Sequence, residues 1–199
     1  MFNSASAFNG DLSNWQTSNV IQMQEMFLGT KAFNGNITLW KTENVADMGS
    51  MFYGAEVFNN DVSKWLTFSV TNMNGMFKSA SAFNGDISLW ETSNVVDMGS
   101  MFLGASAFNG DLSNWQTSNV IRLDSMFLGA KAFNGNITLW KTDNVITMYQ
   151  MFRLASAFNS DLSTWKTGKV IHMNEMFKDS GANRTLCGGA WGSLTGVNN

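Results

Sequence analysis

The chain has few of the residues from which catalytic and metal sites are built. Its 199 residues include no proline, one cysteine (Cys187) and one histidine (His172). A single cysteine excludes a disulfide framework and a thiolate metal cluster. The lone histidine falls in a column of variable residues, which predicts a solvated surface position and leaves no credible Ser–His–Asp or Cys–His set. We therefore predict a protein that is not an enzyme, with no catalytic residues, no metal site and no cofactor.

Charge and long hydrophobic runs are also scarce. Charged residues make up 14% of the chain and the net charge is −3, so the sequence carries no basic footprint for nucleic acid. No apolar run approaches the roughly 18 residues that a transmembrane helix needs. We predict no nucleic-acid partner and no membrane insertion in this segment.

What the chain does contain is seven copies of one 25-residue unit, without insertions or deletions. The copies begin at Ala7, Ala32, Val57, Ala82, Ala107, Ala132 and Ala157. Copies one and five are nearly identical, as are copies two and six, which indicates a duplicated block of 100 residues. A fixed period in this range is typical of a solenoid, in which each unit buries its apolar face only by stacking on its neighbours.

Apolar residues recur in register from copy to copy and define the expected core. Phe recurs every 25 residues from Phe8, Trp from Trp15 and Val from Val20, and all 14 Met residues fall in two ladders. The Met ladders favour core filling beside aromatic rings over soft-metal ligation.

Local spacing within a unit predicts two short extended pieces and one helical corner. Residues 12–15 and 20–23 are short apolar runs bounded by Asn, Ser and Gly, as strands often are. Residues 23, 26, 27 and 30 have the three-and-four spacing of a helical or 3₁₀ turn. The predicted fold is therefore a β-rich solenoid, a coil of short parallel strands with one helical or 3₁₀ turn per 25-residue repeat.

The repeated pattern W-x-T-x-x-V-x-x-M-x-x-M-F-x-x-A-x-x-F-N-x-D-[LIV]-S resembles the short repeat of bacterial surface proteins and lipoproteins related to BspA-like leucine-rich repeats. The resemblance covers residues 1 to about 180. It implies a right-handed, leucine-rich-repeat-like coil and an extracellular or cell-surface location, often in adhesion. It supplies no catalytic residue to carry over.

The predicted domain organisation has three parts. Residues 1–6 are a partial repeat, 7–181 form one solenoid domain, and 182–199 are either a cap or a disordered tail. The half coil at the start leaves the apolar turn of Phe8, Trp15 and Met23 open on one side. Exposed strand edges of this kind favour head-to-tail self-association.

Two polar columns allow a structural and a ligand-binding interpretation. The Asn after each column Phe suggests a hydrogen-bonded ladder rather than a ligand site. The acids in the column of Asp11 and Asp86 favour capping of local backbone N–H groups, with divalent-cation binding as the alternative.

The most favoured function is a non-enzymatic recognition module that binds a protein or cell-surface ligand through variable columns on a rigid ladder. Copy three is distinctive because Leu66 and Phe68 should both be exposed, and two large apolar residues together suggest a contact patch. The candidate partner-binding residues are Leu66, Phe68, Lys41, Glu43, Lys64 and Glu91. The near-identity of copies one and five favours the alternative, a structural spacer or self-associating filament block.

Overall fold

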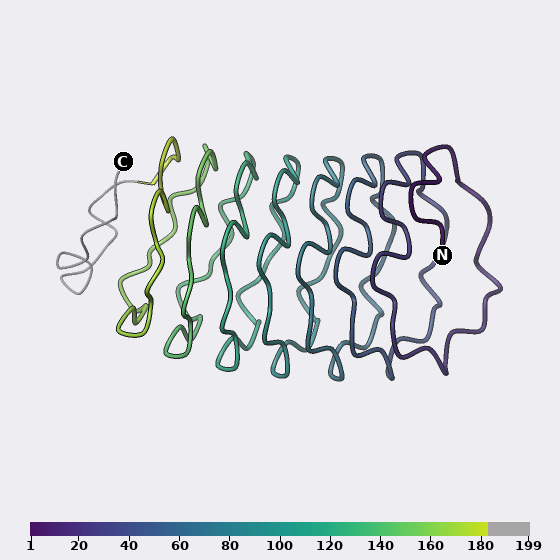
Figure 1. The fold of residues 1–199 in the computed structure, drawn as a ribbon, viewed down its shortest axis with the longest axis horizontal. Coiled ribbons are helices and arrows are strands. Elements are labelled where there is room, and N and C mark those ends of the chain that lie inside the picture. Colours follow the sequence, from purple (N-terminus) through teal and green to yellow (C-terminus); the bar gives the residue numbers. More distant parts are fainter. Residues whose placement is uncertain (183–199) are drawn as a thin grey trace.

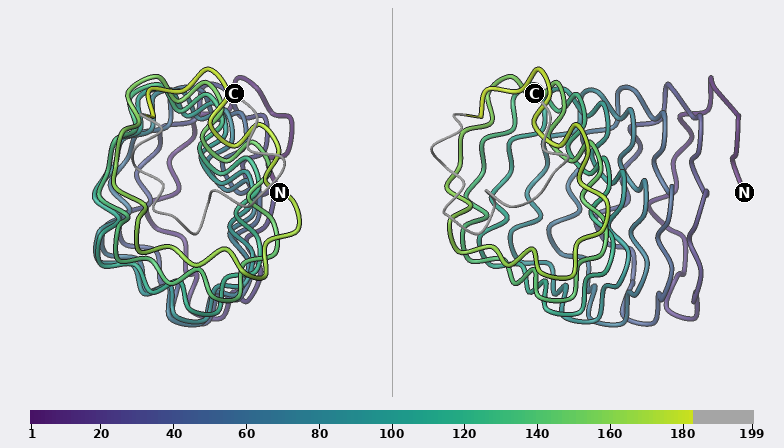
Figure 2. Two further views of the ribbon diagram at one scale, coloured as in Figure 1. Left: turned by 90° about the vertical axis from the view of Figure 1, so that its left-hand side faces the viewer. Right: turned by 60° about the vertical axis from the view of Figure 1, so that its left-hand side comes forward.

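The computed structural model describes residues 1–182, which form a stack of irregular turns, each one repeat long (Figure 1). In the view along the stack, successive turns follow nearly the same closed outline (Figure 2). Equivalent residues of successive repeats therefore lie side by side in columns. The predicted cap or tail at 182–199 lies, apart from Ala182, outside the described residues.

The prediction of a β-rich, right-handed, leucine-rich-repeat-like solenoid with one helical or 3₁₀ turn per repeat is wrong. Residues 1–182 contain no helix and no strand, and the repeating unit is built from consecutive tight turns. Single parallel bridges join neighbouring turns at one column only, which runs through Gln22, Asp47, Asn72, Asp97, Arg122, Thr147 and His172.

The absence of helix and sheet follows from where the backbone N–H groups donate. Between residues 73 and 80, the N–H groups of 73, 75, 77 and 79 donate to carbonyls 24 residues further along, in the next turn of the stack. Those of 76, 78 and 80 donate to carbonyls three residues back. A helix needs all of these bonds to be local, and a sheet ladder needs none of them to be. Alternation satisfies the backbone without forming either element.

Threonine side chains replace part of the remaining ladder. The buried Thr92 hydroxyl accepts the N–H of Gln116 at 2.8 Å and donates to the carbonyl of the same residue at 3.1 Å. Thr42 and Leu66, and Thr142 and Lys166, make the same paired contacts. A side chain thus bridges turns that a strand pair would otherwise join directly.

The core consists of aromatic stacks that run the length of the coil. Phe77 packs face to face on Phe83 of its own turn, with ring centroids 3.8 Å apart, and on Phe102 of the next turn at 5.8 Å. The Trp65 and Trp90 rings lie 6.4 Å apart and 2° from parallel. The Nε1–H of Trp90 donates to the carbonyl of Val62 at 3.1 Å. The predicted burial of the Phe, Trp, Val and Met columns is confirmed.

Candidate functional site

Two of the polar columns are structural, as predicted. The N–H of Asn84 donates to Asn59 Oδ1 at 2.8 Å, and this contact repeats from Asn34 to Asn159. Asp86 Oδ1 accepts the N–H of Ser88 at 2.9 Å. This hydrogen bond, helped by the Ser88 hydroxyl, lowers the pKa of Asp86 despite partial desolvation and the nearby charge of Asp61. Among residues 1–182, no three His, Cys, Asp or Glu side chains are grouped so as to hold a metal ion.

The predicted partner-binding residues lie at or near the surface. Leu66 is 49% exposed and Phe68 39% exposed, on either side of the buried Thr67. Lys64 and Glu91 are also exposed. The exposure predicted for Leu66 and Phe68 is therefore confirmed.

One shallow depression brings several of these residues together. Lys41, Glu43, Lys64 and Leu66 line it, together with Leu39, and its volume is about 290 Å³. Phe68 and Glu91 lie outside the lining. The structure thus unites four of the six predicted residues.

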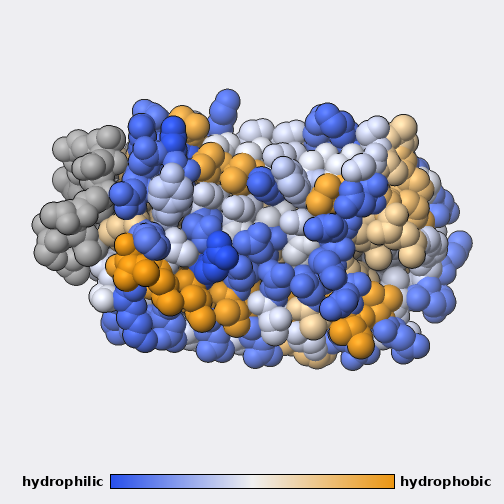
Figure 3. Space-filling model, viewed as in Figure 1, coloured by the Kyte–Doolittle hydropathy of each residue, from blue (hydrophilic) through white to orange (hydrophobic). Residues whose placement is uncertain are grey.

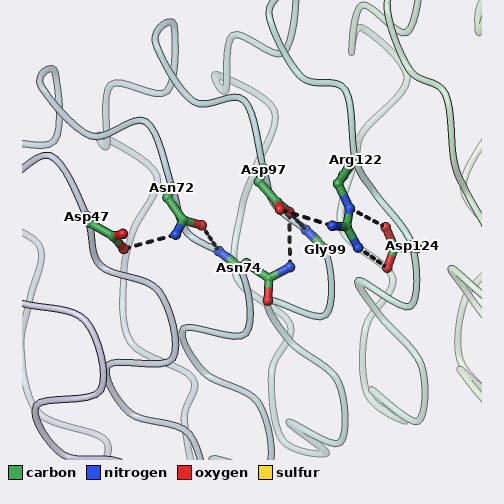
Figure 4. A network of polar contacts seen from close by, with 7 residues as sticks. All are labelled: Asp47, Asn72, Asn74, Asp97, Gly99, Arg122 and Asp124. Carbon is green, nitrogen blue, oxygen red and sulfur yellow. Dashed lines mark hydrogen bonds and ion pairs between the residues drawn. The ribbon is translucent and has the colours of Figure 1, made fainter.

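A second surface was not predicted as a site. We call it the polar band, and Figure 4 shows it crossing four turns through Asp47, Asn72, Asn74, Asp97, Arg122 and Asp124. The column of Gln22, Asp47 and Asn72 was recognised in the sequence only as variable. The spatial link to the neighbouring column of Asn74 and Asp124 was not visible there.

Hydrogen bonds fix the side chains of the polar band. Asp47 Oδ1 accepts the N–H of Gly49 at 2.7 Å and Asn72 Nδ2 at 3.0 Å. Asp97 Oδ1 likewise accepts the N–H of Gly99 at 2.8 Å and Asn74 Nδ2 at 3.1 Å. The side chains are therefore held in place before any ligand arrives.

Arg122 supplies the cation of the band. Its Nε and Nη2 each donate to Asp124 at 3.1 Å, and its Nη1 lies 3.6 Å from Asp97 Oδ2. The hydrogen bonds to Asp124 raise the pKa of Arg122, so the guanidinium stays charged. Depressions lie on both sides of Arg122, one toward Glu25 and Ser50, the other toward Tyr149 and His172. His172 is exposed, as predicted.

An apolar stripe adjoins the band. It consists of one exposed β-branched residue from each of four successive turns: Val96, Ile121, Ile146 and Ile171. Figure 3 shows hydrophobic residues forming a row across successive turns toward the C-terminal end of the described coil. Asn94, Asn119, Asn144 and Lys169 line a depression with the first three stripe residues.

The stripe and the band form one continuous face because their residues are neighbours in the chain. Val96 precedes Asp97, and Ile121 precedes Arg122. The stripe was missed because Val20 and its equivalents stand immediately before it in the sequence. Two adjacent apolar columns, one inside and one outside, have no periodicity that separates them.

No helix in residues 1–182 has the length and hydrophobicity needed to span a bilayer. The family described as "Mycoplasma protein of unknown function, DUF285" matches the chain over residues 1–115 and 110–187. Comparisons with curated proteins and with solved structures gave no match. The resemblance to BspA-like repeats stays a prediction. Because the two matched segments cover most of the chain, this protein belongs to the DUF285 family.

Proposed function

We propose that this coil is a non-enzymatic recognition module whose contact face is formed by the polar band and the apolar stripe. The supporting observation is that fixed polar groups and an exposed apolar row adjoin along the same stack of turns. Binding surfaces commonly combine apolar contact area with a few placed polar groups that set orientation. The stacked aromatic core holds these columns at a constant spacing, so little conformational entropy is lost when a partner binds.

The carboxylates of the polar band favour some ligands over others. Asp47, Asp97 and Asp124 carry three negative charges against the one positive charge of Arg122. Such a surface repels polyanions and favours neutral or cationic groups. A protein or cell-surface ligand of that character fits this face, and the extracellular location expected from the repeat resemblance fits the same proposal.

Arrays of glycans and extracellular proteins, probed with the purified chain, provide the test. The double variant Ile121→Ser/Arg122→Gln removes an apolar and a charged contact from the face. We expect it to lower apparent affinity for the retained ligands by about ten-fold or more, as loss of central contacts does at other interfaces.

The matched control is Leu139→Ser/Lys141→Gln, which makes the same chemical changes at exposed residues of other columns. It should bind as the parent does. The proposal fails if no ligand is retained, or if the two double variants bind alike.

A structural spacer or filament block is the second candidate. It is supported by the near-identity of copies one and five, since a spacer needs only repetition. Concentration-dependent sedimentation distinguishes the two: a filament block elongates as concentration rises, whereas a recognition module of this kind needs no self-association.

A further inference from the structure

The depression around Glu43 holds a carboxylate without a partner. Glu43 Oε2 is covered from solvent and has no hydrogen-bond partner. Neither carboxylate oxygen of Glu43 takes part in an ion pair with any residue from 1 to 182. A covered carboxylate oxygen that lacks a donor is unfavourable, because it has lost its hydration without compensation.

The chain contains its own comparison for this site, four turns further along. Residues 131–142 are identical to 31–42, and Asp143 stands where Glu43 does. There the Nζ of Lys166 donates to Asp143 Oδ1 at 2.7 Å. The residue equivalent to Lys166 in the first site is Leu66.

The backbones of the two sites match, so the difference is confined to the side chain. The N–H of Leu66 donates to Thr42 Oγ1 at 2.9 Å, and the N–H of Lys166 donates to Thr142 Oγ1 at 2.7 Å. Leu66 and Lys166 therefore occupy the same place on their turns. The first site keeps the carboxylate but lacks the cation.

We propose that this depression receives a basic side chain from a partner protein, whose cation takes the place that Lys166 Nζ holds beside Asp143. Leu39 and Leu66 supply aliphatic walls for the stem of that side chain. Phe68 follows Glu43 in the same column and is 39% exposed, so its ring is available to a guanidinium or ammonium group.

The two lysines of the depression specify what must flank that basic residue. Lys41 and Lys64 line the site, and neither pairs with Glu43 within the described part of the chain. Lys141, the equivalent of Lys41, also stands beside Asp143 without displacing Lys166. The partner segment that fits is therefore a basic residue with acidic neighbours, which face Lys41 and Lys64. These residues are not those of the polar band or the apolar stripe, so the inference goes beyond the proposed function.

The test is an NMR titration of the whole chain, followed through leucine methyl signals. One probe is a peptide with arginine between two aspartates, and the other carries neutral citrulline in place of arginine. We expect the arginine peptide to bind about ten-fold more tightly, as a charge-assisted hydrogen bond would give, and to shift the Leu39 and Leu66 signals.

Four variants decide the interpretation. Glu43→Gln and Leu66→Lys should both abolish the preference for arginine, the second because it supplies the cation from within the chain. Lys166→Leu should create a second arginine-selective site beside Asp143. Leu89→Lys adds the same charge at an exposed leucine outside the depression and should leave the preference intact.

Equal binding of the two peptides by the parent overturns the proposal. A preference that survives Glu43→Gln or Leu66→Lys overturns it as well. Because these variants leave the polar band and the apolar stripe unchanged, the outcome is independent of the array experiment.

Discussion

Two residues in each turn hold the backbone in the left-handed region. In one turn they are Gly75, with φ of 62°, and Ser79, with φ of 57°. Their positions lie within the segment where N–H groups alternate between local and inter-turn carbonyls. A right-handed conformation at both would continue a helix, so these two residues allow the alternation.

Leu154 occupies the second of these positions with φ of 60°, where four other turns have glycine. A side chain in this region costs about 1–2 kcal/mol, and Leu154 is largely exposed, so it returns little packing energy. We expect Leu154→Gly to stabilise the chain by up to about 1 kcal/mol after the entropy cost of glycine. Urea unfolding measures the change. Leu139→Gly, at an exposed leucine without positive φ, should destabilise instead, and a loss of stability in Leu154→Gly would contradict the account.

Trp90 combines a place in the aromatic stack with a hydrogen bond across turns. Trp90→Ala removes both, and the cavity alone should cost about 3–5 kcal/mol. Trp90→Phe keeps a ring but leaves the Val62 carbonyl without its donor, and should cost less than the alanine change. A thermal midpoint within a degree or two of the parent for Trp90→Ala would show that the Trp column does not hold the core together.

At the scale of a single turn, cohesion depends on bonds to the next turn rather than on bonds within it. Tight-turn bonds of the kind between Met76 and Met73 fix only a few residues each. The inter-turn N–H bonds, the threonine bridges and the tryptophan donors all reach a neighbouring turn. An isolated turn has none of these partners, so it is not a stable unit by itself.

The threonine bridge gives a direct test at this scale. Thr92→Val keeps the shape of the buried side chain but leaves the N–H and carbonyl of Gln116 without that partner. We expect a loss of about 1–3 kcal/mol, the usual cost of buried unsatisfied groups. Thr92→Ser retains the hydroxyl and should lose less, as measured by denaturant unfolding. Equal losses for the two variants would mean that the methyl group, and not the bridge, matters.

For the whole molecule, register is the dominant constraint. Every inter-turn contact joins residues separated by a fixed distance in sequence, so the stack tolerates the loss or gain of whole units only. Stability in such arrays is approximately a sum of unit and nearest-neighbour terms.

Deletion of residues 82–106 removes one 25-residue unit and brings equivalent columns back together. This variant should fold cooperatively, with a melting temperature below that of the parent because one interface is lost. Deletion of 82–105 removes one residue fewer and places every later side chain one column out of step. Circular dichroism melts and gel filtration should show an unfolded or partly folded chain, whereas equal folding of the two deletions would refute a register-locked stack.

The sequence alone determined the period, the number of copies and the inside columns, because residues such as Phe83 and Trp90 recur at one spacing and have no alternative way to leave water. It also placed Leu66 and Phe68 at the surface. Only the tertiary structure decided the secondary structure, since the short apolar runs fit strands or tight turns equally well and inter-turn bonding selects between them. The face formed by Asp97, Arg122 and the apolar stripe needed the structure for the same reason. Its residues stand a full turn apart in sequence, and only stacking brings them within hydrogen-bond distance.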